Sequence, residues 1–343
     1  MTGDLRLVAP ATARNRDPIW TVLAPELPTS GLVLEIAAAP KHEATRLMQE
    51  IYNEPVKAEL IGKRVAEIKD SGAVVCGWLT PQKVREHYVV AVEAGLDILV
   101  VQGTVISAEH VSTTVEPLNL KEFIAEVPVP TVVGGCASYS TGLHLMRTGA
   151  VGVLVGVGPG AACTTRGVLG IGVPQATAIA DVAAARSQHM LETGEYVNVI
   201  ADGGMRTGGD ISKAIACGAD AVMVGSPLAR AKEAPGRGFH WGMATFHSSL
   251  PRGTRVATKQ DGTMEEILLG PAQENDGTFN LIGALKTSMA TCGYEDIRSF
   301  QRAEVMVAPA LMSEGKKLQN EQSVGMGSNG RAAVSAGVAV SDD

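Results

Sequence analysis

Residues 155–172 read VGVGPGAACTTRGVLGIG, and their first three residues end a run of small apolar residues. That run, 151–157, is rich in β-branched side chains and predicts a buried strand. The glycine-rich loop behind it carries one thiol, Cys163, and a helix is predicted over 176–191 after Pro174. Glycine has no Cβ, so its backbone can approach a ligand closely. A thiol on such a loop, at the carboxyl end of a parallel strand, lies where α/β folds carry nucleophiles.

Strands and helices alternate on both sides of this loop. Each predicted helix joins two predicted strands, which indicates parallel strands linked by crossovers. The predicted strands are 73–78, 97–101, 131–133, 151–157, 197–201 and 221–225, and the predicted helices between them are 81–93, 120–126, 140–148, 176–191 and 210–216. The pattern predicts an α/β fold, a closed TIM (β/α)8 barrel, with a doubly wound open sheet as the second interpretation.

A barrel of eight strands needs two strands before the six just described. Short apolar runs at 5–8, 21–24 and 32–36 are the candidates, but prolines interrupt the segment that would join them. The N-terminal barrel strands are therefore predicted to be incomplete. Amphipathic helices are predicted after them, over 42–52 and 57–69.

The alternation ends after Pro227. A flap is predicted over residues 232–278, in which Asp261-Gly262 indicates a hairpin between strands 254–258 and 264–268. The remaining predictions are a helix over 280–291, a strand over 300–307, one (β/α)8-type catalytic domain over 1–326 and a disordered tail over 327–343.

Composition narrows the class of protein. The net charge of −7 disfavours nucleic acid as a partner. The five cysteines have no paired or metal-ligand spacing, which indicates a reducing compartment. No apolar run is long enough to span a membrane, and no signal peptide is recognisable. We expect a cytoplasmic enzyme with no nucleic-acid or membrane partner.

Two readings of Cys163 compete on the residues alone. A lone intracellular cysteine is more often a small packing residue than a nucleophile, and Cys76, Cys136, Cys217 and Cys292 are predicted to be packing residues.

Two later strands end in Asp202-Gly203-Gly204 and Gly225-Ser226. Loops after adjacent barrel strands commonly bind phosphate, whereas a simple turn would explain one such motif but hardly both.

Three stretches taken together resemble the IMP dehydrogenase / GMP reductase family. They are GVGPGAACTTRGVLGIGVPQ from Gly156, VIADGGMRTGGDISKAIACGADAVMVGS from Val199, and EAPGRG with WGM from Glu233. The resemblance runs from about residue 59 to about residue 308, and it is strongest to a branch that lacks the paired CBS regulatory domains. Too few residues precede the predicted barrel to hold that pair.

The resemblance implies a role for each matching residue. Cys163 would attack C2 of a purine nucleoside monophosphate (IMP, XMP or GMP), with hydride passing to or from NAD or NADP. Thr165 would activate the group that attacks the covalent intermediate, although a loop hydroxyl that caps the backbone is an equal alternative. The other implied contacts are K⁺ at the backbone carbonyls of Gly158, Gly160 and Cys163; the cofactor at Gly156, Val157, Gly158 and Gln102; and the substrate at Asp202, Gly203, Gly204, Gly225, Ser226, Gly242 and Met243. A homotetramer or octamer is also implied.

The sequence departs from the family pattern at four places. Ala161 replaces a serine that contacts phosphate, and Gln102 replaces an aspartate that holds the nicotinamide ribose. The flap has no Arg-Tyr pair to activate water, and Arg252 stands where the family reads the base with an acid or amide. Three hypotheses therefore stand: a dehydrogenase that converts IMP to XMP with NAD, ranked first; a reductase that converts GMP to IMP and ammonia with NADPH; and a non-catalytic purine-nucleotide-binding protein.

Overall fold

The structure is a computed structural model, and it describes residues 39–52, 55–106, 117–241 and 255–307. Six strands form its main sheet: β1 (Cys76–Leu79), β2 (Ile98–Gln102), β3 (Thr131–Cys136), β4 (Gly152–Val155), β5 (Asn198–Ala201) and β6 (Ala221–Val222). The helices that follow or flank them are α3 (Lys41–Tyr52), α4 (Ala58–Asp70), α5 (Val84–Glu93), α6 (Leu120–Glu126), α7 (Tyr139–Met146), α9 (Gln175–Thr193) and α10 (Gly208–Ala216). No helix among these residues is long and apolar enough to cross a bilayer.

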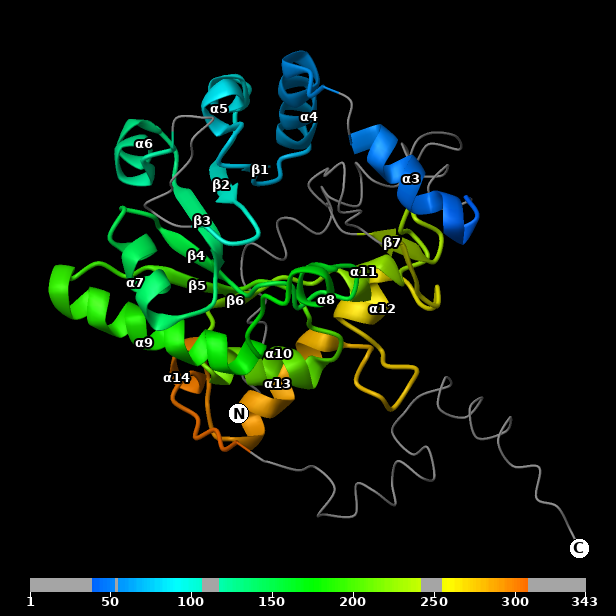
Figure 1. The fold of residues 1–343 in the computed structure, drawn as a ribbon. Coiled ribbons are helices and arrows are strands. Elements are labelled where there is room, and N and C mark those ends of the chain that lie inside the picture. Colours follow the sequence, from blue (N-terminus) through cyan, green and yellow to red (C-terminus); the bar gives the residue numbers. More distant parts are fainter. Residues whose placement is uncertain (1–38, 53–54, 107–116, 242–254, 308–343) are drawn as a thin grey trace, which may run out of the picture.

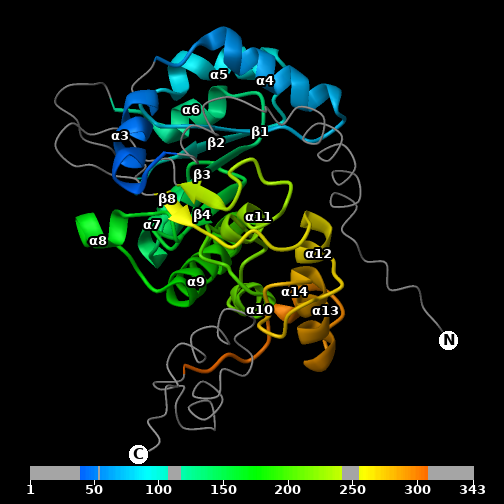
Figure 2. The same cartoon turned by 90° about the vertical axis from the view of Figure 1, so that its right-hand side faces the viewer.

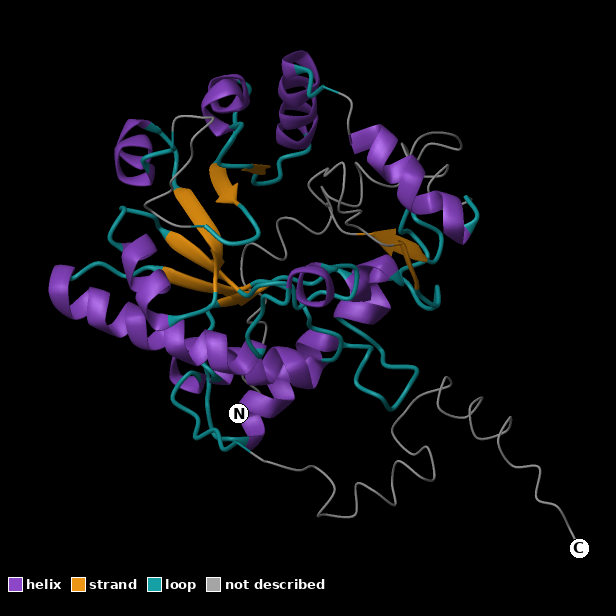
Figure 3. Cartoon of the chain, viewed as in Figure 1, coloured by secondary structure: helices purple, strands orange, loops and turns teal. Residues whose placement is uncertain are grey.

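The sheet is parallel throughout, and its strands lie side by side in chain order from β1 to β6. A doubly wound sheet reverses its strand order at a switch point, so the second interpretation is wrong. Figure 1 shows the strands curling around a common centre, and Figure 3 shows the helices lying outside them. The result is a half-barrel of the kind that belongs to a TIM barrel. The candidates for the first two barrel strands lie in residues 1–38, outside the described residues.

The two faces of the sheet bury different side chains because alternate residues of a strand point to opposite sides. Leu99, Val133 and Val199 point outward and pack with the helices in the main core. Val100, Val132 and Leu154 point inward and form a small apolar layer with Ile98 and Ile200. Side chains inside a barrel form such layers. The inward residues at the carboxyl ends of the strands therefore face the region where barrel enzymes bind their ligands.

The segment after the sheet differs most from the sequence predictions. Residues 264–268 form a helix, α12 (Met264–Leu268), and not the second strand of a hairpin. The cause is a capping box, in which the Thr263 hydroxyl accepts from the Glu266 N–H while the Glu266 carboxylate accepts from the Thr263 N–H. The first predicted strand does form, as β8 (Arg255–Ala257), but its antiparallel partner is β7 (Phe239–Trp241).

The predicted strand over 300–307 is also wrong. A short helix, α14 (Ile297–Phe300), is capped by Asp296 and ends where the strand was expected to begin. Phe300 is buried, whereas residues 304–307 are exposed and pair with no strand among the described residues. The helix predicted over 280–291 is confirmed as α13 (Leu281–Thr291). Figure 2 shows α13 and α14 beside α10, against the outside of the barrel.

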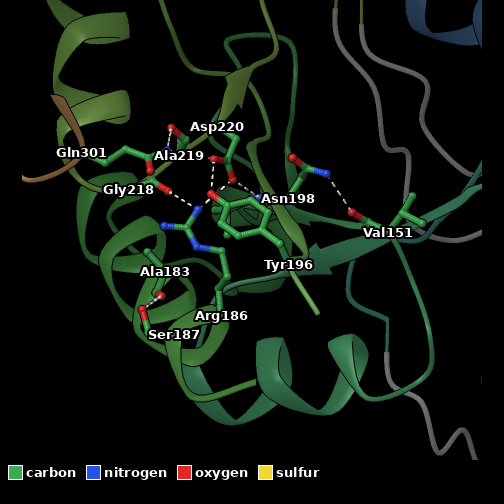
Figure 4. A network of polar contacts seen from close by, with 11 residues as sticks. Val151, Ala183, Arg186, Ser187, Tyr196, Asn198, Gly218, Ala219, Asp220 and Gln301 are labelled. Carbon is green, nitrogen blue, oxygen red and sulfur yellow. Dashed lines mark hydrogen bonds and ion pairs between the residues drawn. The ribbon is translucent and has the colours of Figure 1, made fainter. Parts of the chain in front are cut away.

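A polar network closes the amino-terminal end of β5 and β6 (Figure 4). The Asp220 carboxylate, just before β6, accepts from Arg186 Nη1 at 2.7 Å, from the Tyr196 hydroxyl at 2.6 Å and from the Val199 N–H at 2.8 Å. Gln301 Nε2 donates to the same carboxylate at 2.9 Å. The network ties α9, both strands and the turn after α14 to one acid, whose side chain is 18% exposed.

Candidate active site

The loop after β4 is held in place from both ends by one side chain. Arg166 donates from Nε to the Val157 carbonyl at 3.0 Å and from Nη2 to the Val173 carbonyl at 2.7 Å. Arg166 itself lies on a short helix, α8 (Thr165–Leu169), which sequence analysis did not predict. Gly167 lies in the middle of that helix, and because glycine has a low helix propensity the sequence does not indicate a helix there. Arg166 therefore joins the start and the end of the loop that carries Cys163.

Cys163 is exposed, and its Sγ lies 3.2 Å from Oγ1 of Thr165. Thr165 is only 1% exposed and is the first residue of α8, so its hydroxyl is fixed beneath the thiol. In the thiol form Sγ donates to this oxygen, and in the thiolate form the hydroxyl can donate to sulfur instead. The loop thus presents an accessible sulfur with one oriented hydroxyl beside it.

The other cysteines contrast with Cys163. Cys136 is buried in β3, and burial raises the pKa of its thiol to about 12, so it cannot act as a nucleophile near neutral pH. The prediction that it packs in the core is confirmed. Cys76 and Cys292, which were also predicted to pack, are instead exposed at the start of β1 and the end of α13. Burial still raises the pKa of the Cys76 thiol.

Asp202 follows β5 directly and faces the inside of the sheet. Its Oδ2 accepts from Nε2 of Gln102, the last residue of β2, at 2.7 Å. Burial raises the pKa of the Asp202 carboxyl, and the hydrogen bond from Gln102 opposes that shift. The predicted cofactor residue Gln102 therefore contacts the predicted substrate residue Asp202, and the role of each toward a ligand stays a prediction.

The Cys163 loop and the Asp202 loop meet each other. The Asp202 N–H donates to the Val155 carbonyl at 2.8 Å, which joins the two strand ends. A Cβ on Gly204 would lie 3.1 Å from the Pro159 carbonyl oxygen, so the two loops are in close backbone contact there. Gly156, at the start of the loop, sits against Gln175 and Asp202 with φ 136°, where other residues are strained.

The next strand end carries Ser226, the first residue of the short helix α11 (Ser226–Ala229). Its Oγ lies 3.1 Å from Nε2 of His240 in β7. Burial lowers the pKa of the His240 imidazole, and its buried Nδ1 has no hydrogen-bond partner within the part of the chain that the structure describes. Sequence analysis missed His240, although its place one residue before the Trp-Gly-Met motif could have pointed to it.

Two glycines at these strand ends have no packing reason to be glycine. A Cβ on Gly160 or on Gly225 would meet nothing within 4 Å, and neither residue has a positive φ. Bare backbone that faces open space is what a ligand needs in order to approach peptide N–H groups. Gly242 and Met243, the residues predicted to contact the base, lie outside the described residues.

The arrangement also bears on a metal and a cofactor. The described residues contain no group of three or more histidine, cysteine or acidic side chains that could hold a metal ion. The predicted K⁺ ligands are backbone carbonyls, and that of Gly160 accepts the Cys163 N–H at 3.1 Å within the same tight loop. Carbonyl oxygens are ligands that suit a hard cation, so the type of donor fits K⁺, and the binding of K⁺ and of a nicotinamide cofactor to these residues stays a prediction.

Comparison with known proteins places this geometry in one family. Residues 53–317 match the sequence profile of the IMP dehydrogenase / GMP reductase domain. The chain is 48% identical over 281 residues to an uncharacterized oxidoreductase of Mycolicibacterium smegmatis, and the alignment covers 80% of this chain and 75% of that protein.

Two solved structures are similar to the half-barrel. An IMP dehydrogenase/GMP reductase-like protein from Corynebacterium glutamicum superposes with a TM-score of 0.75 at 46% identity, over 81% of this chain and 74% of that one. A GMP reductase from Trypanosoma brucei, solved in complex with guanosine 5′-monophosphate, superposes with a TM-score of 0.55 at 32% identity, over 67% of this chain and 48% of that one.

Proposed function

The chain is an oxidoreductase of the IMP dehydrogenase / GMP reductase family, and from that premise we propose that it oxidises IMP to XMP with NAD. The observation that carries the proposal is the exposed Cys163 thiol beside the buried Thr165 hydroxyl, on a loop that contacts the Asp202 strand end. An accessible sulfur among open strand-end loops is suited to covalent catalysis on a small ligand.

Recognition of the nucleotide comes first. The Asp202 carboxylate can accept hydrogen bonds from ribose hydroxyls. The backbone N–H groups of Gly204 and Gly225 and the hydroxyl of Ser226 can donate to the phosphate, whereas the Gly203 N–H donates to the Ala201 carbonyl at 3.2 Å. The tautomer of His240 that carries its proton on Nε2 donates to Ser226 Oγ and leaves the serine proton free to point at the phosphate. These groups would hold the monophosphate while the purine extends over Cys163.

Covalent chemistry follows at C2 of the base. The Cys163 thiolate adds to C2 and forms a C–S bond, with the Thr165 hydroxyl able to donate to sulfur before attack. A nicotinamide bound against residues 156–158 would supply the acceptor for the hydride that leaves C2 with its electron pair. Water then adds to C2, the C–S bond breaks and the thiol is restored. The sum is IMP, NAD⁺ and water converted to XMP, NADH and a proton.

The reverse type of reaction is the second candidate. The flap lacks the Arg-Tyr pair that would activate water in a dehydrogenase, and the chain is similar to a GMP reductase that binds GMP. In that direction Cys163 adds to C2 of GMP, ammonia leaves, and hydride from NADPH reaches C2 to give IMP and release the thiol. A third candidate keeps the nucleotide contacts without turnover.

One pair of assays separates these functions. The protein is incubated with IMP and NAD, and separately with GMP and NADPH, while the absorbance of the reduced cofactor is followed. We expect it to rise in the first mixture and stay constant in the second. A fall in the second alone would assign the reductase. No change in either mixture, together with tight IMP binding by calorimetry, would assign the non-catalytic protein.

We also propose that the protein assembles as a homotetramer or octamer. The support is the family to which the chain belongs. Light scattering at micromolar concentration is expected to give a mass of at least four chains. A mass of one chain would refute the assembly.

A further inference from the structure

The hydrogen bond between Gln102 and Asp202 joins strands that are not neighbours. Strands β3 and β4 lie between β2 and β5 in the sheet, yet Nε2 of Gln102 reaches Asp202 Oδ2 at 2.7 Å. Both side chains point inward, since Gln102 shares its face with Ile98 and Val100, and Asp202 shares its face with Ile200. The bond therefore crosses the mouth of the half-barrel.

Glycines make this crossing possible. Gly134, Gly135 and Gly156 occupy the strand ends that lie between the two side chains. A Cβ on Gly134 would lie 2.4 Å from Cβ of Leu154, and one on Gly135 would lie 2.7 Å from the Gly156 carbonyl oxygen. Side chains at these positions would force the strand ends apart. Their absence lets the sheet curl tightly enough for β2 to reach β5.

The bond leaves half of the carboxylate available. Among the described residues Asp202 Oδ1 has no hydrogen-bond partner, and Oδ2 has only the amide of Gln102. An ionised carboxylate can accept about four hydrogen bonds. A neutral amide fixes the plane of the group and leaves its negative charge intact, whereas a lysine or arginine would neutralise the charge and compete for the free oxygen. The fixed, charged and half-open carboxylate is a receptor for two adjacent hydroxyl groups.

We propose that Gln102 is a positioning residue that aims the Asp202 carboxylate at a vicinal diol, and that it thereby sets a preference for ribonucleotides over 2′-deoxyribonucleotides. This inference rests on the proposed function, because it takes the ligand to be a purine nucleoside monophosphate. Gln102 acts through Asp202 and does not itself need to touch the sugar. If the amide is removed, the carboxylate can rotate, and the energetic difference between one hydroxyl and two becomes smaller.

The test measures binding of IMP and of 2′-deoxy-IMP by calorimetry without cofactor. A hydroxyl bound to a carboxylate contributes roughly tenfold or more in affinity, so wild-type protein is expected to prefer IMP by about that factor. In Gln102→Leu the preference is expected to fall to about threefold or less. Gln102→Met keeps about the length of the side chain but removes the hydrogen-bond donor, and it is expected to lose the preference as well.

Asn198→Ala is the matched control. Asn198 lies at the other end of β5, where its Nδ2 donates to the Val151 carbonyl at 3.0 Å. Its loss removes an amide hydrogen bond of the same strand without touching Asp202, so the preference is expected to stay at the wild-type value. An unchanged preference in folded Gln102→Leu or Gln102→Met would overturn the inference while the proposed function stands. Failure of wild-type protein to bind either nucleotide would overturn both.

Discussion

Two aspartates lie at opposite ends of the same pair of strands, and they differ in how many hydrogen bonds their carboxylates accept. Asp220, at the amino-terminal end of β6, accepts four hydrogen bonds, one of them from the Arg186 guanidinium. Asp202, at the carboxyl end of β5, accepts one hydrogen bond from the described residues, and its donor is the neutral amide of Gln102. A fully satisfied acid stabilises the fold, whereas a half-satisfied one retains capacity for a ligand. The amino-terminal end therefore serves stability and the carboxyl end serves binding, a division common to barrels.

The largest expected effect concerns Cys163 and separates activity from stability. Cys163→Ala is expected to lower turnover by about a thousandfold or more, because no other group can form the bond to C2. Nucleotide affinity is expected to stay within about tenfold, since the ribose and phosphate contacts lie on other loops. Stopped-flow or steady-state assays and calorimetry measure the two quantities.

Cys292→Ala is the control for that change. Cys292 is a second exposed cysteine, at the end of α13, and its loss is expected to leave turnover unchanged. Treatment with 6-chloropurine ribotide followed by intact-mass analysis is expected to label wild-type protein once and Cys163→Ala not at all. Undiminished turnover in Cys163→Ala would refute covalent catalysis.

The second effect concerns the amino-terminal end of the strands. Asp220→Ala is expected to lower the free energy of unfolding by about 3 kcal/mol, because it leaves the buried Arg186 charge unpaired. IMP affinity is expected to stay close to the wild-type value. Denaturant unfolding measures the change, and Asp181→Ala, an exposed acid on α9, is expected to shift stability by about 0.5 kcal/mol or less. Equal stability of both variants would show that the two strand ends do not differ in this way.

Some of the structural features behind these predictions could be predicted from the sequence, and others could not. The six strands and the helices between them were predictable because apolar runs alternate with helices at regular spacing and glycines mark the turns. The exposed position of Cys163 on the loop after β4 was predictable because a strand and a glycine-rich loop flank it, whereas its role as a nucleophile stays a prediction. Helix α12 was not, because the capping box at Thr263 overrides the short apolar run that follows. Helix α8 was hidden by Gly167.

Side-chain contacts across the sheet are a second kind of feature that could not be predicted from the sequence. Gln102 and Asp202 are 100 positions apart, and their contact depends on how tightly the strands curl. The glycine pair at 134–135 that allows this curl reads in the sequence as an ordinary part of a loop. The partnership of Ser226 with His240 is hidden for the same reason, because β7 folds back onto α11 from beyond the sheet. The positions of these residues at the strand ends were therefore predictable, and their pairings were not.

The third expected effect is at Ser226, on the binding end of the strands. Ser226→Ala is expected to weaken IMP binding by roughly ten- to a hundredfold, because a hydrogen bond to a charged phosphate contributes about 1.5–3 kcal/mol. Binding of inosine, which has no phosphate, is expected to be weak and unchanged by the substitution. Calorimetry with both ligands makes the comparison.

Ser187→Ala is the matched control for that result. The Ser187 hydroxyl donates to the Ala183 carbonyl on the exposed side of α9, beside the network at the amino-terminal end of the strands (Figure 4). Its removal is expected to leave both affinities unchanged. A wild-type protein that binds inosine as tightly as IMP would refute phosphate recognition at this end of the sheet.

The smallest expected effect concerns His240, whose Nε2 lies 3.1 Å from Ser226 Oγ. Burial lowers the pKa of its imidazole in the folded state, so as pH falls the unfolded chain takes up this proton before the folded chain does. The stability contributed by the neutral ring is present above the unfolded pKa, near 6.5, and it is lost as pH falls below that value. Partial solvent exposure of the ring keeps the effect small.

We expect His240→Gln to lose less stability than wild type between pH 7.5 and pH 5.5, measured as the difference between paired denaturant titrations. The buried histidines His87 and His189 are present in both proteins and cancel in that difference. Parallel pH profiles would show that the buried ring does not hold its proton less tightly in the folded protein, and that the carboxyl end of the sheet is less desolvated than its geometry indicates.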